Sequence, residues 1–200
     1  IASGGNYNTV VGDEAGTALT TGDNNVAIGF EALKTEDGHG QNVAVGYRAL
    51  KTLNAGGDAH NTAVGNLAGE DVTTGTGNTL IGSLSGMGLT TGGSNTALGY
   101  NSLEVDTAGS KTVAIGFNAL QAQNFSSATD SNNTAVGYNA GISVTTGTNN
   151  TIMGSSAGDA LTDADNNVAF GHLSLTTDTK GSRNTALGYA TLQTQNFTTA

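Results

Sequence analysis

Three histidines and several neighbouring acidic residues are the side chains in this sequence that could transfer protons or bind metal ions. His39, His60 and His172 occur at different points of the repeat described below, so their spacing does not bring them together. A catalytic triad or a metal centre needs side chains that converge on one place. We therefore predict no enzymatic activity, no catalytic residues, no metal site and no cofactor.

The acidic residues gather in segments that read as turns. The pairs are Glu36–Asp37, Glu70–Asp71 and Asp163 with Asp165. Acidic residues are common in turns because their side chains satisfy local backbone groups and stay hydrated, so we expect these carboxylates to be solvated. Asp159, together with Asp163 and Asp165, could hold one calcium ion weakly. The chain lacks the repeated Gly-Gly-x-Gly-x-Asp pattern of calcium-binding β-rolls.

Composition excludes several classes of partner. The 200 residues carry a net charge of −10, and the six basic residues are scattered singly. Nucleic-acid binding requires a concentrated positive surface, which this distribution does not provide. No apolar run approaches the roughly 18 residues of a membrane span. There is no cysteine, so no disulfide is available. The chain starts and stops inside repeat-like sequence, and we read it as a segment of a longer polypeptide.

A short repeat organises the whole chain, residues 1–200. Asn, then Thr or Val, a small or aliphatic residue, a large apolar residue and Gly recur with a period of 17 residues, lengthened once to 19 and once to 21. This period is typical of one coil of a parallel β-solenoid, in which each coil buries a face against the next. We number the Asn of each coil as position zero. The coils start near residues 8, 25, 42, 61, 78, 95, 112, 133, 150, 167 and 184.

Each coil has a short segment that is apolar on two sides. Positions one and three share one side of a strand, and position two faces the other way. We expect positions one and three to face the solenoid interior, and position two, which is Ala in most coils, to face outward. An outward row of small apolar residues such as Ala135 predicts packing against other copies of the chain. The alternative is a second sheet of the same chain covering this row. On this assignment Ala135→Glu disrupts assembly more than Asp178→Lys, which we place on the surface.

The second half of the coil conserves volume. Position eight is either Gly or Leu, and where it is Gly a Leu or Val follows three residues later. One large side chain per coil is thus expected to fill this half of the core. Gly at position four of every coil indicates a steric requirement. Residues 61–132 and 133–200 repeat a larger unit of four coils, whose long coils should form loops on one edge. Exposed aromatic candidates are Phe125 and Phe197 in these loops, and Tyr47, Tyr100, Tyr138 and Tyr189 at position five.

The motif Asn133–Tyr138, Asn-Thr-Ala-Val-Gly-Tyr, and the Val-Ala-Ile-Gly segments at Val26–Gly29 and Val113–Gly116 carry a resemblance. The chain resembles the repeat arrays of trimeric phage and virus tail fibres, and the left-handed parallel β-roll heads of trimeric autotransporter adhesins. The resemblance covers essentially the whole chain. It implies an all-β, left-handed β-roll of about eleven coils, a homotrimer, and a location in a virion fibre or on a cell surface.

Three functions are open at this point. The first is a structural segment of a fibre or surface adhesin that projects a host-attachment element. The second is a host-recognition module that binds glycans through the exposed aromatic residues named above. A third, ice binding, follows from the repeated Thr-Thr-Gly segments, although Glu36, Asp37, Asp163 and Asp178 interrupt the threonine row.

Overall fold

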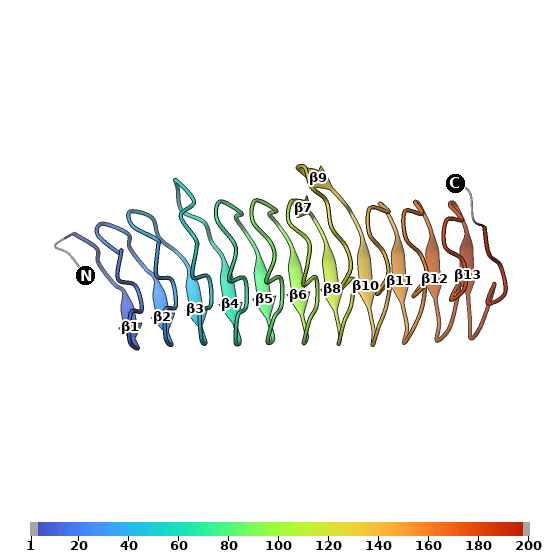
Figure 1. Ribbon diagram of the computed structural model, residues 1–200, viewed down its shortest axis with the longest axis horizontal. Helices are drawn as coiled ribbons and strands as arrows, with labels where there is room; N and C mark the ends of the chain where they lie inside the picture. Colours follow the sequence, from blue (N-terminus) through green and yellow to red (C-terminus); the bar gives the residue numbers. More distant parts are fainter. Residues whose placement is uncertain (1–3, 198–200) are drawn as a thin grey trace.

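The computed structural model describes residues 4–197 and is an all-β parallel solenoid (Figure 1). Each coil contributes one short strand to a single sheet whose strands follow the chain order. The strands are β1 (Thr9–Val11), β2 (Val26–Ile28), β3 (Val43–Val45), β4 (Thr62–Val64), β5 (Thr79–Ile81), β6 (Thr96–Leu98), β8 (Val113–Ile115), β10 (Thr134–Val136), β11 (Thr151–Met153), β12 (Val168–Phe170) and β13 (Thr185–Leu187). Two shorter strands, β7 (Gly109–Ser110) and β9 (Thr129–Asp130), pair separately. The predicted period and coil number are confirmed.

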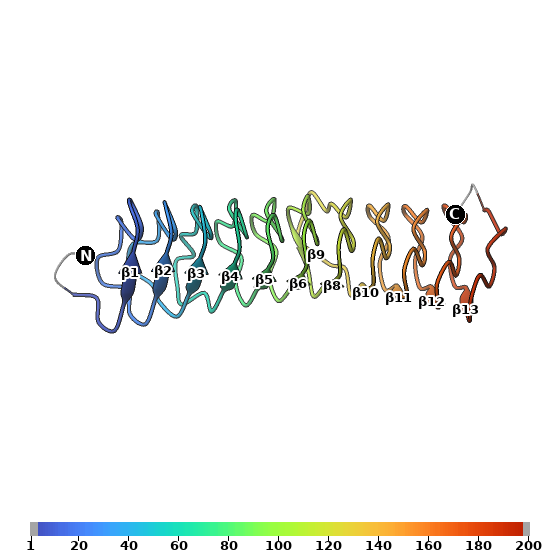
Figure 2. The same cartoon turned by 90° about the horizontal axis from the view of Figure 1, so that it is seen from below.

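The strands pair in parallel, with equivalent positions of successive coils side by side. Val113 of β8, for example, lies beside Thr96 of β6 and Thr134 of β10. Figures 1 and 2 show the coils stacked in a line along the long axis of the molecule. No helix occurs among residues 4–197, and so none of a length and apolarity that could cross a membrane is found there.

The return limb of each coil consists of turns and bends, yet its backbone still bonds to neighbouring coils. Leu33 N donates to Ala49 O at 3.0 Å, and Thr20 N donates to Asp37 O at 2.7 Å. The Thr-Thr-Gly segments of this limb lie in bends and form no strand. Several threonine hydroxyls of this row, such as those of Thr73 and Thr90, donate to a carbonyl of the next coil. Bonding around the whole coil satisfies backbone groups that regular strands would otherwise satisfy.

A buried ladder of asparagine side chains connects the coils at position zero. The Oδ1 atom of Asn78 accepts a bond from the backbone N–H of Asn95, and its Nδ2 group donates to Gly92 O at 2.9 Å. Each Asn thus satisfies the backbone at a corner that is closed to water. Thr112 breaks the series, and Gln123 compensates by donating to the Thr112 hydroxyl and accepting from the Asn133 amide.

The interior contains the position-two row and large side chains from the return limbs, two of which, Leu50 and Leu53, come from the coil of β3. Leu33, Leu50, Leu103, Leu120 and Leu175 at position eight are fully buried. Where position eight is Gly, the buried residue is Leu19, Val72, Leu89, Val144 or Leu161. The expected exchange of volume between the two positions is confirmed for these coils.

The larger residues at position two complete this exchange. A Cβ atom added to Gly69 or to Gly86 would lie 2.7 Å from a methyl carbon of Leu80, and one added to Gly141 would lie 2.9 Å from Ile152 Cδ1. Leu80 and Ile152 therefore occupy the space that glycines at position eight leave open. Close packing of this kind makes the core sensitive to a single methyl group.

The structure reverses the predicted orientation of the strand faces. Position two points into the core, so Ala135 and its equivalents in β2 to β11 are fully buried. Positions one and three, which we expected inside, face outward and are half-buried or exposed. The coil also encloses a Leu or Val side chain from its return limb, which leaves little room in the interior. Only one side chain of the strand, either a small one or a single larger one, fits opposite that Leu or Val. Within residues 4–197 the position-two row is covered by the remainder of its own coil, which consists mostly of turns and bends; the only other sheet there is the short β7–β9 pair.

Candidate binding surfaces

The outward face of the sheet carries a continuous row of large apolar side chains. It consists of the position-three residues Val11, Ile28, Val45, Val64, Ile81, Leu98, Ile115, Val136, Met153, Phe170 and Leu187, which we call the outer stripe. Leu98 is 43 % exposed and Phe170 is 46 % exposed, although each belongs to a strand that is paired on both sides. Thr or Val at position one lines the same face. A row of this kind is the unpartnered side of an otherwise well-packed sheet.

Aromatic rings at position five form a second row beside the outer stripe. The ring centroids of Phe30 and Tyr47 lie 5.5 Å apart and are stacked, and Phe117 stacks between Tyr100 and Tyr138 at 5.3 and 5.4 Å. Tyr47, Tyr100, Tyr138 and Tyr189 are all exposed. The parallel register places equivalent rings one coil apart, which produces the offset stacking that aromatic pairs prefer.

The two loop phenylalanines differ from each other. Phe197 is exposed, as predicted, whereas Phe125 is buried, which contradicts its assignment as a surface aromatic residue. The backbone of Phe125 is held by Asp106, whose Oδ1 atom accepts its N–H at 3.0 Å. The loops of the long coils do project on one edge, where the loop after β3 and the β9 segment extend beyond the neighbouring coils (Figure 1).

Three acidic side chains are fully buried: Glu36, Asp106 and Asp178. We expected Glu36 and Asp178 to lie in solvent and did not single out Asp106. All three occupy position eleven, where the other coils have Leu, Val or Gln, and each precedes a coil that carries Leu or Gln there. Asp178 accepts bonds from the N–H groups of Gly181 and Phe197 and from the Gln195 amide. The placement of Asp178 on the surface was therefore wrong. Two of its partners, Gln195 and Phe197, come from the following coil, so no local pattern reveals them.

Charged side chains of the first coils form a network on the surface. Glu31 is buried to 7 % exposure, and its carboxylate contacts Lys34 at 2.6 Å, Arg48 Nε at 2.8 Å and Lys51 at 3.2 Å. Lys34 also pairs with Glu14. The hydrogen bond from Lys34, with help from Lys51, lowers the pKa of Glu31 to about 2.

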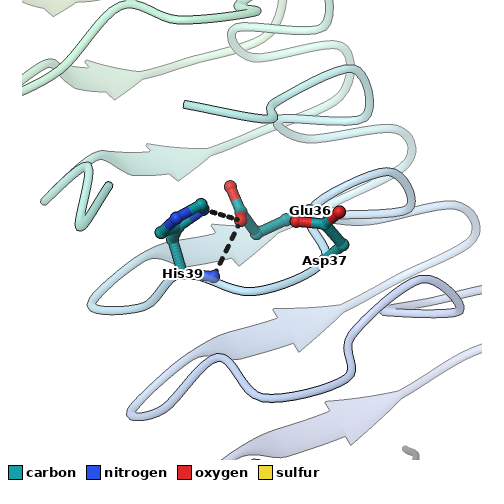
Figure 3. A group of neighbouring side chains, drawn as sticks. All are labelled: Glu36, Asp37 and His39. Atoms are coloured by element: carbon teal, nitrogen blue, oxygen red, sulfur yellow. Dashed lines mark hydrogen bonds and ion pairs between the residues drawn. The ribbon is translucent and has the colours of Figure 1, made fainter. Parts of the chain in front are cut away.

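One group of side chains has the composition of a metal site. Glu36, Asp37 and His39 each place a ligand atom within 4.8 Å of the others, and they form the only such group of three within residues 4–197 (Figure 3). The structure thus assembles a group from Glu36 and Asp37, expected to be solvated, and His39, expected to stand alone. Asp163 instead pairs with Lys180 at 3.3 Å, and Asp165 accepts bonds from Thr148, so these two do not form the calcium group considered above.

The described surface has no enclosed site, since residues 4–197 form no pocket. Comparison of the chain with protein-family models, with curated proteins and with solved structures found no match. The candidate binding sites are therefore the outer stripe, the ring row, and the group of Glu36, Asp37 and His39.

Proposed function

We propose that this chain is a structural segment of a trimeric fibre or surface adhesin, which holds a host-attachment element away from a virion or a cell. The observation that carries the proposal is the outer stripe, an uninterrupted apolar row along the whole length of a linear solenoid. A rod whose coils repeat one hydrogen-bonding scheme holds its two ends a fixed distance apart, which is what a spacer requires.

The size of the outer stripe supports self-association. Coils spaced about 4.8 Å apart give a row roughly 50 Å long, and a width of about 10 Å gives an area on the order of 500 Å² per chain. Monomeric proteins rarely expose more than a few hundred Å² of contiguous apolar surface. A stable interface buries about 800 Å² per partner, so the outer stripe would supply more than half of one such interface, and the adjacent ring row would extend it. Every coil presents the same positions on its outward face. Identical chains that lie side by side with their coils in register can therefore pack their outer stripes against one another.

The assembly is tested by sedimentation equilibrium of the purified chain. We expect a mass three times that of the 19.8 kDa chain. Charges placed in the middle of the outer stripe by the double substitution Leu98→Glu with Ile115→Glu should give a folded monomer, because like charges would face each other across the interface. Thr74→Glu is the matched control, as Thr74 is exposed on the return limb. A wild-type chain that stays monomeric at 100 µM would refute the proposal.

A second function, glycan recognition, is favoured by one specific observation, the stack of exposed rings Tyr100, Phe117 and Tyr138. The exposed edges of these stacked rings, together with the tyrosine hydroxyls, offer a sugar both apolar contact and hydrogen bonds. Glycan-array binding that Tyr138→Ala abolishes would favour this role. Binding to no glycan, or binding unchanged by Tyr138→Ala, would leave the spacer function alone.

A further inference from the structure

The group Glu36, Asp37 and His39 lies in the turn that follows the return limb of the β2 coil (Figure 3). Glu36 is fully buried, His39 is half-buried and Asp37 is exposed, so the group reaches from the core to the surface. The Oε1 atom of Glu36 accepts the backbone N–H of His39 at 3.1 Å and lies 3.3 Å from Nδ1 of its ring.

The buried carboxylate has one oxygen without a partner. Among the described residues no donor forms a hydrogen bond with Glu36 Oε2, and the Nδ1 atom of His39 also lacks one. A buried carboxylate oxygen without a partner loses its hydration and gains nothing in return. Glu36 therefore has a ligand requirement that the protein itself does not meet.

The same coil position elsewhere in the chain shows how a purely structural acid is satisfied. Asp106 accepts two backbone N–H groups on one oxygen and the Gln123 amide on the other. Asp178 has the same arrangement. In the coil that starts at Asn25 the acid is the longer Glu36, and His39 stands where the other two coils have Gly109 and Gly181. The next coil carries Leu53 at the position where the coils after Asp106 and Asp178 carry Gln123 and Gln195. The changes remove the amide donor and introduce an imidazole, which is a change toward metal-binding chemistry.

The backbone that carries the three side chains is held firmly. The carbonyl of Asp37 accepts the N–H and the hydroxyl of Thr20, at 2.7 and 2.8 Å. The carbonyl of His39 accepts the Asn25 amide at 3.0 Å, and a Cβ atom on Gly22 would lie 2.1 Å from it, so the two coils are in close contact here. A ligand set on a held backbone loses little conformational entropy when it binds an ion.

From these observations we propose that Glu36, Asp37 and His39 bind a divalent transition-metal ion of the zinc class. One imidazole with two carboxylates is a donor set that Zn²⁺ accepts, whereas Ca²⁺ and Mg²⁺ prefer oxygen donors alone. A carboxylate that binds through both oxygens would give Glu36 Oε2 its missing partner. The ion would lie between Glu36 and His39, and it would link the interior of the rod to its surface. The site is independent of the proposed fibre function.

The test is calorimetric titration of the full chain with ZnCl₂, together with thermal melting in its presence. We expect a site with a stoichiometry of one ion per chain. His39→Ala should weaken zinc binding at this site at least tenfold and abolish the zinc-dependent rise in melting temperature, and Asp37→Asn should weaken it by a similar factor. Both side chains reach the surface, so these variants should fold.

His172→Ala is the control, because this exposed imidazole lies against Tyr189 and outside the group. It should bind zinc at the same site as tightly as the wild type does. Zinc binding that His39→Ala leaves unchanged, or wild-type protein that binds no zinc at 1 mM, would overturn the assignment.

Discussion

Single residues direct the path of each coil through backbone angles that most side chains avoid. Position four has φ between 117° and 145° in every coil, and there only glycine occurs. Position six also has positive φ, but in the left-handed helical region, where it accepts residues such as Arg48 and Asn118. Leu at position eight has φ near 50°, which costs about 1–2 kcal/mol. Its full burial contributes about 1.5–3 kcal/mol, so the leucine is retained.

Gly116 is the residue at which this requirement is tested most directly. Gly116→Ala should destabilise the protein by about 3 kcal/mol or more. Its φ of 133° costs an alanine about 1–3 kcal/mol, and the added Cβ would lie 2.3 Å from Gly137 O. Urea denaturation followed by circular dichroism measures the change. Gly57→Ala is the control, since a Cβ there meets nothing within 4 Å. Equal loss in both variants would argue against a steric role for position four.

At the scale of the elements, each strand is stabilised by contacts made outside it. Three residues form too short a strand to be stable alone, and the asparagine ladder and the buried return-limb residues supply the rest. The return limbs differ in what they add. The coils of β2 and β3 use the ion pairs around Glu31, whereas the long coil of β8 is fastened by Asp106.

Glu31 makes the ion pairs of the first coils dependent on pH. Its pKa falls from 4.5 to about 2 on folding, so its contribution to stability is complete above pH 4.5 and disappears as the pH falls through 2. We expect Glu31→Gln to lower the melting temperature at pH 7 and to have a progressively smaller effect between pH 4.5 and pH 2. Thermal melts of both proteins across this range provide the measurement. A difference that stays constant down to pH 2 would contradict the role of the charge.

At the scale of the whole molecule, the two apolar rows of the sheet differ in their exposure. The position-two row is buried inside the coil, and the outer stripe is exposed on the isolated chain. Substitutions on the two rows should therefore affect different properties, folding in the first case and association in the second.

Ala135→Glu and Ile115→Glu separate these properties with the same introduced charge. Ala135 is fully buried, so a glutamate there should prevent its coil from closing and reduce the β-sheet signal in circular dichroism. Ile115 faces outward, so its glutamate variant should keep the β-sheet signal of the wild type and lose mass in sedimentation. If the two variants lost β-sheet signal equally, the orientation of the strand would be in question.

The sequence alone determined the repeat, the number of coils, the glycine requirement, the projecting loops and the exchange of volume between positions eight and eleven. These are local or periodic properties, and each coil shows them again. Tertiary structure decided which apolar row is inside. Alternation along a strand tells which residues share a face, but the inner face depends on the space left by the return limb. It also decided that Glu36, Asp106 and Asp178 are buried and that Glu36 meets His39, because such contacts depend on how the chain turns back and how the next coil lies against it.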